Sequence, residues 1–248
     1  MKTTKNKQYG WFAHAYDSLM SKNKYDRWAQ LIKDVVEKYD IKKGPALDVA
    51  CGTGQIASSL ASLGFQVTGI DLSAKMIGVA KRKKLPIKFV VADMRNFSLP
   101  KQEFVLATSF YDSLNYLLSD DDMLKTFKSV YRHLSPGGIF LFDMNTRQHV
   151  LAAQRYKPRV SEGKDFYAIF RFGGEDRVWT LDIDVFIKQK SAYKLFREHH
   201  RERGYDKADI RPLLEKAGFS LILTKIDYAI YEDNKKRPSR LYFLAKKP

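Results

Sequence analysis

The first residues that could do chemistry form a turn between an apolar run and a helix-like segment. Residues 47–54 read Leu-Asp-Val-Ala-Cys-Gly-Thr-Gly and lead directly into segment 55–60. Gly52 and Gly54 have no Cβ, so a ligand can lie against their backbone, and a helix that begins there offers N–H groups without partners. The pattern predicts a cofactor cradle, although a single Gly-x-Gly also occurs at ordinary strand-to-helix corners.

Two acidic residues favour the cofactor interpretation. Asp71 follows Gly54 by 17 residues (71 minus 54) and ends the β-branched segment 65–71. An acid roughly 20 residues beyond such a turn reaches the ribose hydroxyls of a bound nucleoside. Asp93 ends the next strand-like segment, 87–93, in the same way. These spacings predict a ligand that contains a nucleoside.

The elements that position these acids alternate along the chain. Strand-like and helix-like patterns follow one another from residue 45 to residue 145, which predicts βαβ units and a parallel sheet with helices on both faces. Ligands bind beyond the carboxyl ends of the strands in such sheets. The acids expected near those ends are Asp48, Asp71, Asp93, Asp112 and Asp143.

The pattern changes after Asn145. Segments 166–172, 178–187 and 193–203 alternate in strand fashion without helices between them, which predicts an inserted antiparallel meander. The α/β pattern then resumes with a helix and two strands, expected at 207–217, 219–226 and 241–245.

The N-terminal segment contains two helical patterns, at 9–20 and 28–36. Two interpretations remain open. The helices pack on the body of the protein, or they form a lid whose tyrosines, Tyr9 and Tyr16 among them, offer rings and hydroxyls to a pocket.

Composition sets broad limits. The chain has 248 residues, enough for one large α/β domain with an insertion. Its single cysteine, Cys51, excludes an internal disulfide. The chain contains no run of 18 apolar residues, so no membrane-spanning helix is predicted. The formal net charge is +16, but the basic residues are spread along the chain, which is typical of a solvated surface; attraction to nucleic acid is the alternative. We expect a cytoplasmic protein, monomeric or homodimeric.

The order of these motifs resembles that of the class I S-adenosylmethionine-dependent methyltransferases. Their glycine motif is matched by residues 48–54, their ribose acid by Asp71, and their adenine-contacting pair by Asp93 and Met94. The turn before their fifth strand is matched by residues 134–138. The resemblance implies an α/β fold, with a Rossmann-like seven-stranded sheet, helices on both faces and an inserted antiparallel β meander.

The whole chain is most similar to a group of mostly uncharacterised bacterial small-molecule methyltransferases. Three further motifs carry this likeness: F-A-x-x-Y-D at 12–17, D-S-x-N-Y at 112–116 and E-x-H-x-x-R-x-Y at 198–205. The implied domains are an N-terminal helical lid, a Rossmann-like S-adenosylmethionine-binding core and an inserted β substrate subdomain. Their expected bounds are 1–44 for the lid, 45–145 and 204–248 for the core, and 146–203 for the subdomain.

The resemblance implies S-adenosyl-L-methionine as cofactor and S-adenosyl-L-homocysteine as product. Asp48 suits the ammonium end, Asp71 the ribose hydroxyls and Asp93 the adenine amino group. The full set of expected cofactor residues is Tyr9, Tyr16, Asp48, Ala50, Gly52, Gly54, Asp71, Leu72, Met76, Asp93, Met94 and Ser109.

Methyl transfer from a sulfonium mainly requires alignment and exclusion of water. An amine acceptor must first lose a proton, and a hydroxyl acceptor needs a base during attack. The candidate catalytic residues are Tyr16, Asp112, Asn115 and His200. Strand alternation places Glu198, His200 and Glu202 on one face. On that face His200 either takes part in catalysis, or it only pairs with a neighbouring carboxylate or lies at a contact between subunits.

The sequence therefore predicts a methyltransferase that acts on an N or O atom of a small-molecule acceptor. Two alternatives stay open: methylation of ribosomal or transfer RNA, favoured by the net charge, and a non-catalytic protein that only binds the cofactor. No metal site is expected, because segment 143–145 is the only acid–amide pair at a strand end.

Overall fold

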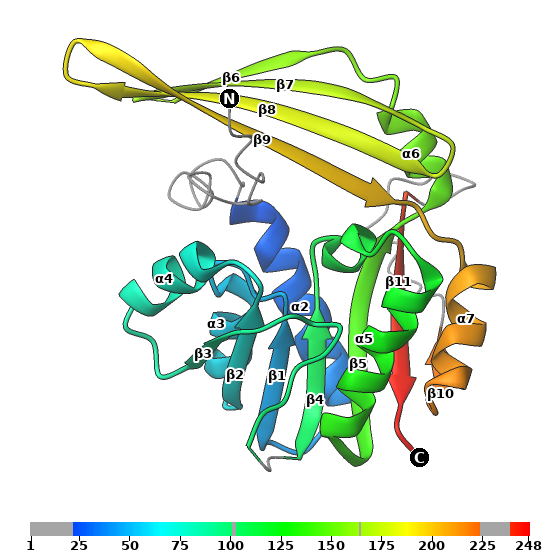
Figure 1. The fold of residues 1–248 in the computed structure, drawn as a ribbon. Coiled ribbons are helices and arrows are strands. Elements are labelled where there is room, and N and C mark those ends of the chain that lie inside the picture. Colours follow the sequence, from blue (N-terminus) through cyan, green and yellow to red (C-terminus); the bar gives the residue numbers. More distant parts are fainter. Residues whose placement is uncertain (1–21, 101–102, 164, 224–238) are drawn as a thin grey trace.

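A seven-stranded sheet forms the centre of the protein (Figure 1). The computed structural model describes residues 22–100, 103–163, 165–223 and 239–248. The strand order is β10-β11-β5-β4-β1-β2-β3, which confirms the predicted seven-stranded Rossmann-like sheet. Its strands are β1 (Pro45–Val49), β2 (Gln66–Asp71), β3 (Lys88–Val91), β4 (Phe104–Ser109), β5 (Leu134–Asn145), β10 (Ser220–Leu223) and β11 (Arg240–Lys246).

Strands β1 to β5 are parallel, and β11 runs antiparallel between β5 and β10. The reversal matters for the site, because β11 begins where β5 ends. Arg240, the first residue of β11, pairs in register with Asn145, the last residue of β5. A basic side chain is thereby brought to the sheet edge at which the acids lie.

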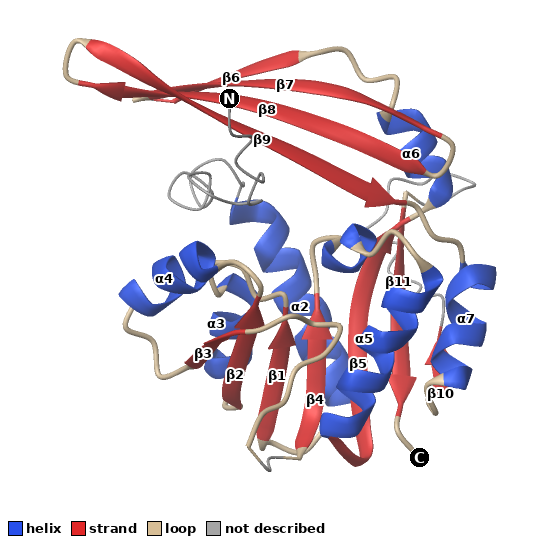
Figure 2. Cartoon of the chain, viewed as in Figure 1, coloured by secondary structure: helices blue, strands red, loops and turns tan. Residues whose placement is uncertain are grey.

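Helices cover both faces of this sheet (Figure 2). On one face, α2 contributes Trp28 and Ile32 to an apolar layer, and α3 contributes Ala57 and Leu60. Helices α5 and α7 pack on the other face. The helices are α2 (Lys22–Lys38), α3 (Gln55–Ser62), α4 (Ala74–Arg82), the 3-10 turn η1 (Ser113–Tyr116), α5 (Asp120–His133), α6 (Arg147–Ala153) and α7 (Lys207–Lys216).

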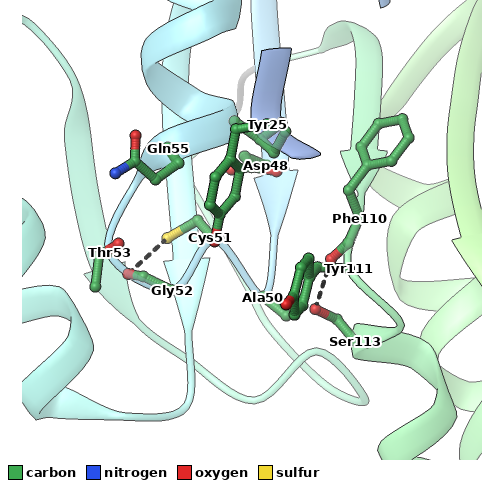
Figure 3. Close-up of a pocket in the computed structure, with 11 residues that line it drawn as sticks. Tyr25, Asp48, Ala50, Cys51, Gly52, Thr53, Gln55, Phe110, Tyr111 and Ser113 are labelled. Atoms are coloured by element: carbon green, nitrogen blue, oxygen red, sulfur yellow. Dashed lines mark hydrogen bonds between the residues drawn. The ribbon is translucent and has the colours of Figure 1, made fainter. Parts of the chain in front are cut away.

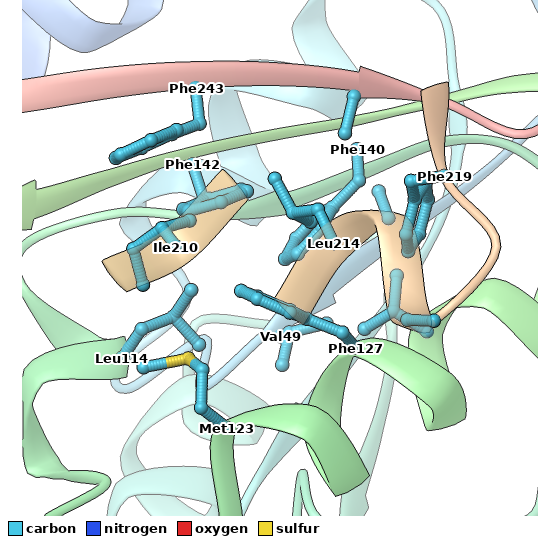
Figure 4. Close-up of a cluster of buried hydrophobic side chains, with 14 of the residues drawn as sticks. Val49, Leu114, Met123, Phe127, Phe140, Phe142, Ile210, Leu214, Phe219 and Phe243 are labelled. Atoms are coloured by element: carbon cyan, nitrogen blue, oxygen red, sulfur yellow. The ribbon is translucent and has the colours of Figure 1, made fainter. Parts of the chain in front are cut away.

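The alternation of side chains along β5 explains the two apolar layers. Phe140 and Phe142 point to the α5 side, where they meet Phe127 and Phe243 (Figure 4). The Phe142 and Phe243 rings stack with centroids 4.9 Å apart. Leu141 points to the opposite layer. Because successive side chains of a strand face opposite ways, a continuous apolar run fits a strand that is covered on both faces.

A second sheet of four antiparallel strands, in the order β6-β7-β8-β9, lies over the carboxyl ends of the parallel strands (Figure 1). Met76 of α4 packs under this sheet against Ala168, Phe170 and Ile183. The strands are β6 (Arg159–Gly163), β7 (Phe166–Glu175), β8 (Val178–Gln189) and β9 (Ala192–Arg203).

The meander has one strand more than the sequence predicts, and a linker helix also escaped prediction. Strand β6 spans five residues that are mostly exposed, so it lacks a strong alternation. Helix α6 has only seven residues, about two turns, which is too short for a clear apolar period. The predicted helix at 9–20 and the end of the predicted strand 219–226 lie outside the described residues.

Candidate active site

In the glycine turn that follows β1, every second residue from Ala50 to Gly54 has a left-handed backbone conformation. Ala50, Gly52 and Gly54 have φ angles of 56°, 54° and 82°, all in the left-handed region. A Cβ on Gly54 would lie 2.7 Å from Cζ of Phe89, whereas a Cβ on Gly52 would have no neighbour within 4 Å. Gly54 is therefore required for the turn to pack against Phe89 of β3, and the face of Gly52 is open for a ligand.

The open face of the turn borders a cavity of about 40 Å³ (Figure 3). It lies between the turn, the start of α3, helix α2 and the loop that follows β4. The residues around it are Tyr25, Asp48, Ala50, Cys51, Gly52, Thr53, Gln55, Ile56, Phe110, Tyr111 and Ser113. The rings of Tyr25 and Tyr111 stack 6.0 Å apart and form an aromatic wall of this cavity, and Tyr25 was not singled out from the sequence.

Asp48 at this cavity has an incomplete set of hydrogen bonds. Its side chain is buried, and its Oδ1 accepts a hydrogen bond of 2.9 Å from Oγ1 of Thr108. Its Oδ2 is buried without a hydrogen-bond partner among the described residues, as is Oγ of Ser109. Burial raises the pKa of Asp48 to about 7. A buried carboxylate oxygen without a hydrogen-bond donor suits a ligand that carries an ammonium group.

We expect Asp48→Asn to stabilise the cofactor-free protein above neutral pH. The folded-state pKa of about 7 exceeds the ordinary value of 3.8. The stability that the proton on Asp48 contributes is therefore complete below pH 3.8 and is lost as the pH rises through 7. The asparagine side chain stays neutral at every pH, so the variant does not lose this stability. At pH 8 the variant gains up to about 4 kcal/mol over the wild type. Urea unfolding at pH 5 and pH 8 measures this; an equal difference at both would contradict it.

Asp71 links the glycine turn to the end of β2. Its Oδ2 accepts a hydrogen bond from the backbone N–H of Gly52, and its Oδ1 accepts one from Ser73, both 2.8 Å long. Burial raises the pKa of Asp71, although both hydrogen bonds oppose the shift. Each oxygen retains a lone pair for a ligand hydroxyl. Leu72 beside it is 67% exposed, which leaves an apolar surface next to the carboxylate.

Asp93 is held by a residue that the sequence did not single out. Arg95 donates to its carboxylate from the backbone N at 2.9 Å, from Nε at 3.0 Å and from Nη2 at 2.6 Å. These hydrogen bonds lower the pKa of Asp93, so it stays ionised. Arg95 also reaches Asp122 of α5 at 3.2 Å. Met94 packs against the apolar layer under α5.

Asn115, predicted to be catalytic, is fully engaged within the protein. Its Nδ2 donates to the carbonyl oxygens of Asn145 at 3.0 Å and Arg203 at 2.7 Å, and its Oδ1 accepts from the N–H of Asn145 at 2.9 Å. The side chain is completely buried. Asn115 thus joins β5, β9 and the loop after β4, and both N–H groups of its amide are engaged by backbone carbonyls.

His200 is engaged in the same way. Its Nδ1 lies 3.0 Å from Oη of Tyr116, and its Nε2 lies 3.1 Å from Oε2 of Glu198. Oη of Tyr205 donates to the carbonyl of Leu117. The D-S-x-N-Y and E-x-H-x-x-R-x-Y motifs are therefore partners of each other. Of the two predicted roles of His200, the geometry supports pairing with a carboxylate rather than catalysis.

We expect Asn115→Ala to destabilise the fold by about 2–4 kcal/mol, because three buried backbone groups lose their partner. Urea unfolding measures the loss. Asn96, which is exposed, provides the control, and Asn96→Ala should change stability by less than about 0.5 kcal/mol. A normally stable Asn115→Ala protein without activity would instead return this residue to catalysis.

Asp112, the fourth predicted catalytic residue, belongs to a buried ionic cluster. Arg240 donates from Nη2 to Oδ1 of Asp112 at 2.9 Å and from Nη1 to Oδ2 of Asp143 at 2.7 Å. Oδ1 of Asp143 accepts the N–H of Asp112 at 2.9 Å. Glu202 of β9 adds a third carboxyl group, whose Oε2 accepts from Nε1 of Trp179 at 3.1 Å.

The cluster is electrostatically unbalanced. Burial, followed by the charge of Asp112, raises the pKa of Glu202 well above its ordinary value. Burial also raises the pKa of Asp143, although Arg240 opposes the shift. Glu202 and Arg240 were not predicted to belong to the site. The alternation of β9 was a signal for Glu202, but Arg240 is separated from Asp112 by 128 residues and has no local signal.

The structure gathers most of the predicted cofactor residues at one sheet edge. Those at the glycine turn or at the ends of β2, β3 and β4 are Asp48, Ala50, Gly52, Gly54, Asp71, Leu72, Asp93, Met94 and Ser109. Met76 instead packs under the second sheet. Tyr9 and Tyr16 lie outside the described residues. Within the described ranges, no three His, Cys, Asp or Glu side chains are grouped so that they could hold a metal ion.

The sheet order, the glycine turn and the acids after β2 and β3 define a class I S-adenosylmethionine-dependent methyltransferase. A model of the family described as "Methyltransferase domain" matches residues 46–138. The chain is 36% identical over 244 residues to the Bacillus subtilis protein "Putative methyltransferase YqeM". The alignment covers 96% of this chain and 97% of the Bacillus subtilis protein. The chain belongs to this family of methyltransferases, and its cofactor is S-adenosylmethionine.

Two solved structures resemble the whole chain. An S-adenosylmethionine-dependent methyltransferase from Clostridium acetobutylicum has a TM-score of 0.83 and 28% identity, over 96% of this chain and 98% of that one. The sugar N-methyltransferase KedS8 from Streptoalloteichus has a TM-score of 0.79 and 20% identity, over 100% of this chain and 95% of that one. The second likeness shows the fold alone. No helix within the described residues is long and apolar enough to cross a membrane.

Proposed function

We propose that the protein transfers the methyl group of S-adenosylmethionine to an N or O atom of a small-molecule acceptor. The observation that carries this proposal is the second sheet, which lies over the carboxyl ends of the parallel strands (Figure 1). A roof of this kind encloses a modest acceptor and excludes water. The similarity in fold to a sugar N-methyltransferase supports a small acceptor.

The cofactor residues follow from chemistry that is already present in the site. The free Oδ2 of Asp48 suits the ammonium group, the open backbone at Gly52 suits the methionine part, and Asp71 suits the ribose hydroxyls. Asp93, held in place by Arg95, suits the adenine amino group, with Leu72 against the ring. The bound sulfonium supplies an activated methyl group, and the protein aligns the acceptor with it.

A metabolite extract supplied with methyl-labelled cofactor tests this function. We expect label in one or a few small products, and none when Asp71→Ala protein replaces the wild type. Label that remains in macromolecules, or no label in any fraction, would contradict the proposal.

RNA methylation is the second candidate, and one surface feature favours it. A hollow of about 560 Å³ beside Asp93 is lined by Arg95, Lys125, Lys128 and Arg132 among its seven residues. Together with the net charge of +16, this basic surface suits phosphate groups. Transfer of label to purified ribosomal or transfer RNA at physiological salt would favour it. RNA binding that disappears at that salt would count against it.

A further inference from the structure

The segment that follows β3 has no regular secondary structure of its own. Residues 92–100 form neither helix nor strand, and they include Asp93, the residue suited to the adenine amino group. At the start of the segment, the N–H of Ala92 donates to the carbonyl oxygen of Asp71 at 2.9 Å. Beyond that point its position depends on contacts with other elements, because no ladder of backbone hydrogen bonds holds it.

Three side chains on one face of α5 provide these contacts. Asp122, Ser129 and His133 are separated by seven and four positions (129 minus 122 and 133 minus 129), so at 3.6 residues per turn they lie in a row along the helix. Oδ2 of Asp122 accepts from Nη1 of Arg95 at 3.2 Å. Oγ of Ser129 donates to the carbonyl oxygen of Arg95 at 2.9 Å. The row therefore fixes both the backbone and the side chain of Arg95.

His133 holds the far end of the segment. Its Nδ1 lies 2.7 Å from the carbonyl oxygen of Ser129, which can only accept, so the ring proton is on Nδ1. Nε2 is then the acceptor, and the N–H of Leu99 donates to it at 3.2 Å. The ring also stacks on the buried ring of Phe97, with centroids 4.4 Å apart. Polar and apolar contacts together fasten the segment to α5.

Arg95 transmits this constraint to Asp93. It supplies three N–H donors to the carboxylate: its backbone N, Nε and Nη2. A carboxylate offers about four lone-pair positions, so one more donor can be accommodated. The Asp93 side chain is 32% exposed and borders the hollow of about 560 Å³. The remaining position is thus open to a donor on a ligand.

We propose that Ser129 and His133 are positioning residues that set the preference of the site for adenine, acting through Arg95 on the Asp93 carboxylate. The inference rests on the proposed function, in which Asp93 accepts the adenine amino group, and it holds for any methyl acceptor. A hydrogen bond weakens steeply with distance and angle, so a displaced Arg95 leaves the carboxylate badly aimed. A purine without the amino group brings no donor to this carboxylate.

Adenosine and purine riboside differ only in the 6-amino group, so they measure this preference. Neither carries the methionine part of the cofactor, and the ionisation of Asp48 therefore does not affect the comparison. Displacement of labelled S-adenosylmethionine from the full chain gives both affinities. We expect the wild type to bind adenosine about 10-fold or more tightly than purine riboside. The ratio of the two affinities is independent of the fraction of protein that is folded.

Variants on α5 test the positioning role. We expect Ser129→Ala and His133→Phe each to reduce the preference to about 3-fold or less, because the carbonyl of Arg95 or the N–H of Leu99 loses its partner. The phenylalanine keeps a ring beside Phe97 and removes only the acceptor. His133→Gln should restore most of the preference, because its amide oxygen accepts the Leu99 N–H in place of Nε2.

Thr126 provides the matched control on the same helix. It is equally buried, but its Oγ1 donates within α5, to the carbonyl oxygen of Asp122 at 2.9 Å. Thr126→Val should keep the wild-type preference. The positioning role is overturned if Ser129→Ala and His133→Phe keep that preference, if Thr126→Val loses it equally, or if His133→Gln behaves like His133→Phe.

Asp93→Ala separates this inference from the proposed function. The variant should bind adenosine and purine riboside almost equally, because the partner of the amino group is gone. If it keeps the wild-type preference, the assignment of Asp93 to adenine fails, and the inference fails with it. If Asp93→Ala loses the preference while the α5 variants keep it, the assignment stands and only the positioning role is wrong. Methyl transfer itself is decided separately, by label in the metabolite extract.

Discussion

Arg240→Met is expected to lower the free energy of unfolding by about 3–5 kcal/mol. The guanidinium contacts Asp143 at 2.7 Å and Asp112 at 2.9 Å, and the Asp143 side chain is completely buried. Its removal leaves a buried carboxyl group that must either stay charged without a partner or take up a proton. Either outcome costs free energy.

Urea unfolding at neutral pH measures this loss. The double variant Arg240→Met, Asp143→Asn removes the orphaned charge together with its partner, and we expect it to recover a substantial part of the stability. Arg211, whose ion pair with Glu215 is 2.8 Å long but more than half exposed, provides the matched control. Arg211→Met should cost no more than about 1 kcal/mol. Equal losses of unfolding free energy for the two arginine variants would show that the buried ion pairs stabilise the fold no more than an exposed one.

Asp71→Ala is expected to weaken the binding of S-adenosylmethionine about 100-fold or more. Hydrogen bonds to a charged group are worth about 1.5–3 kcal/mol each, and the carboxylate suits two ribose hydroxyls. It also accepts the backbone N–H of Gly52, so part of the effect comes from a less ordered glycine turn. Isothermal calorimetry with the cofactor measures the change in affinity.

A cofactor analogue that lacks one ribose hydroxyl separates the two contributions. The wild type should bind this analogue more weakly than the cofactor, whereas Asp71→Ala should bind both almost equally, because the partner of the missing hydroxyl is already gone. Asp121→Ala, at a side chain 71% exposed on α5, should leave the affinity unchanged. A variant that still prefers the complete ribose would show that Asp71 does not contact it.

The parts of the fold that the sequence predicted correctly depend on local patterns. The strand-to-helix turn at Gly52 and Gly54, the acid that ends β2, and the alternation of β9 each depend on residues close together in the chain. Asp93 was expected to end β3, but that strand ends at Val91, two residues earlier. Strand β6 and helix α6 escaped prediction because each is short, and β6 is mostly exposed. Side-chain periodicity is weak where neither face of an element is well buried.

The sequence by itself determined the class of enzyme and its cofactor, since glycines and acids at set spacings meet the cofactor through elements close together in the chain. Only the tertiary structure decided which contacts the residues predicted for the acceptor side make. Asn115 meets the carbonyl of Arg203 across 88 residues, and Arg240 meets Asp143 across 97. Such contacts arise because β9 lies over the sheet edge and β11 runs antiparallel beside β5. No local pattern records which side chains those two strands engage, so the roles of Asn115, His200, Glu202 and Arg240 appear only when the chain is folded.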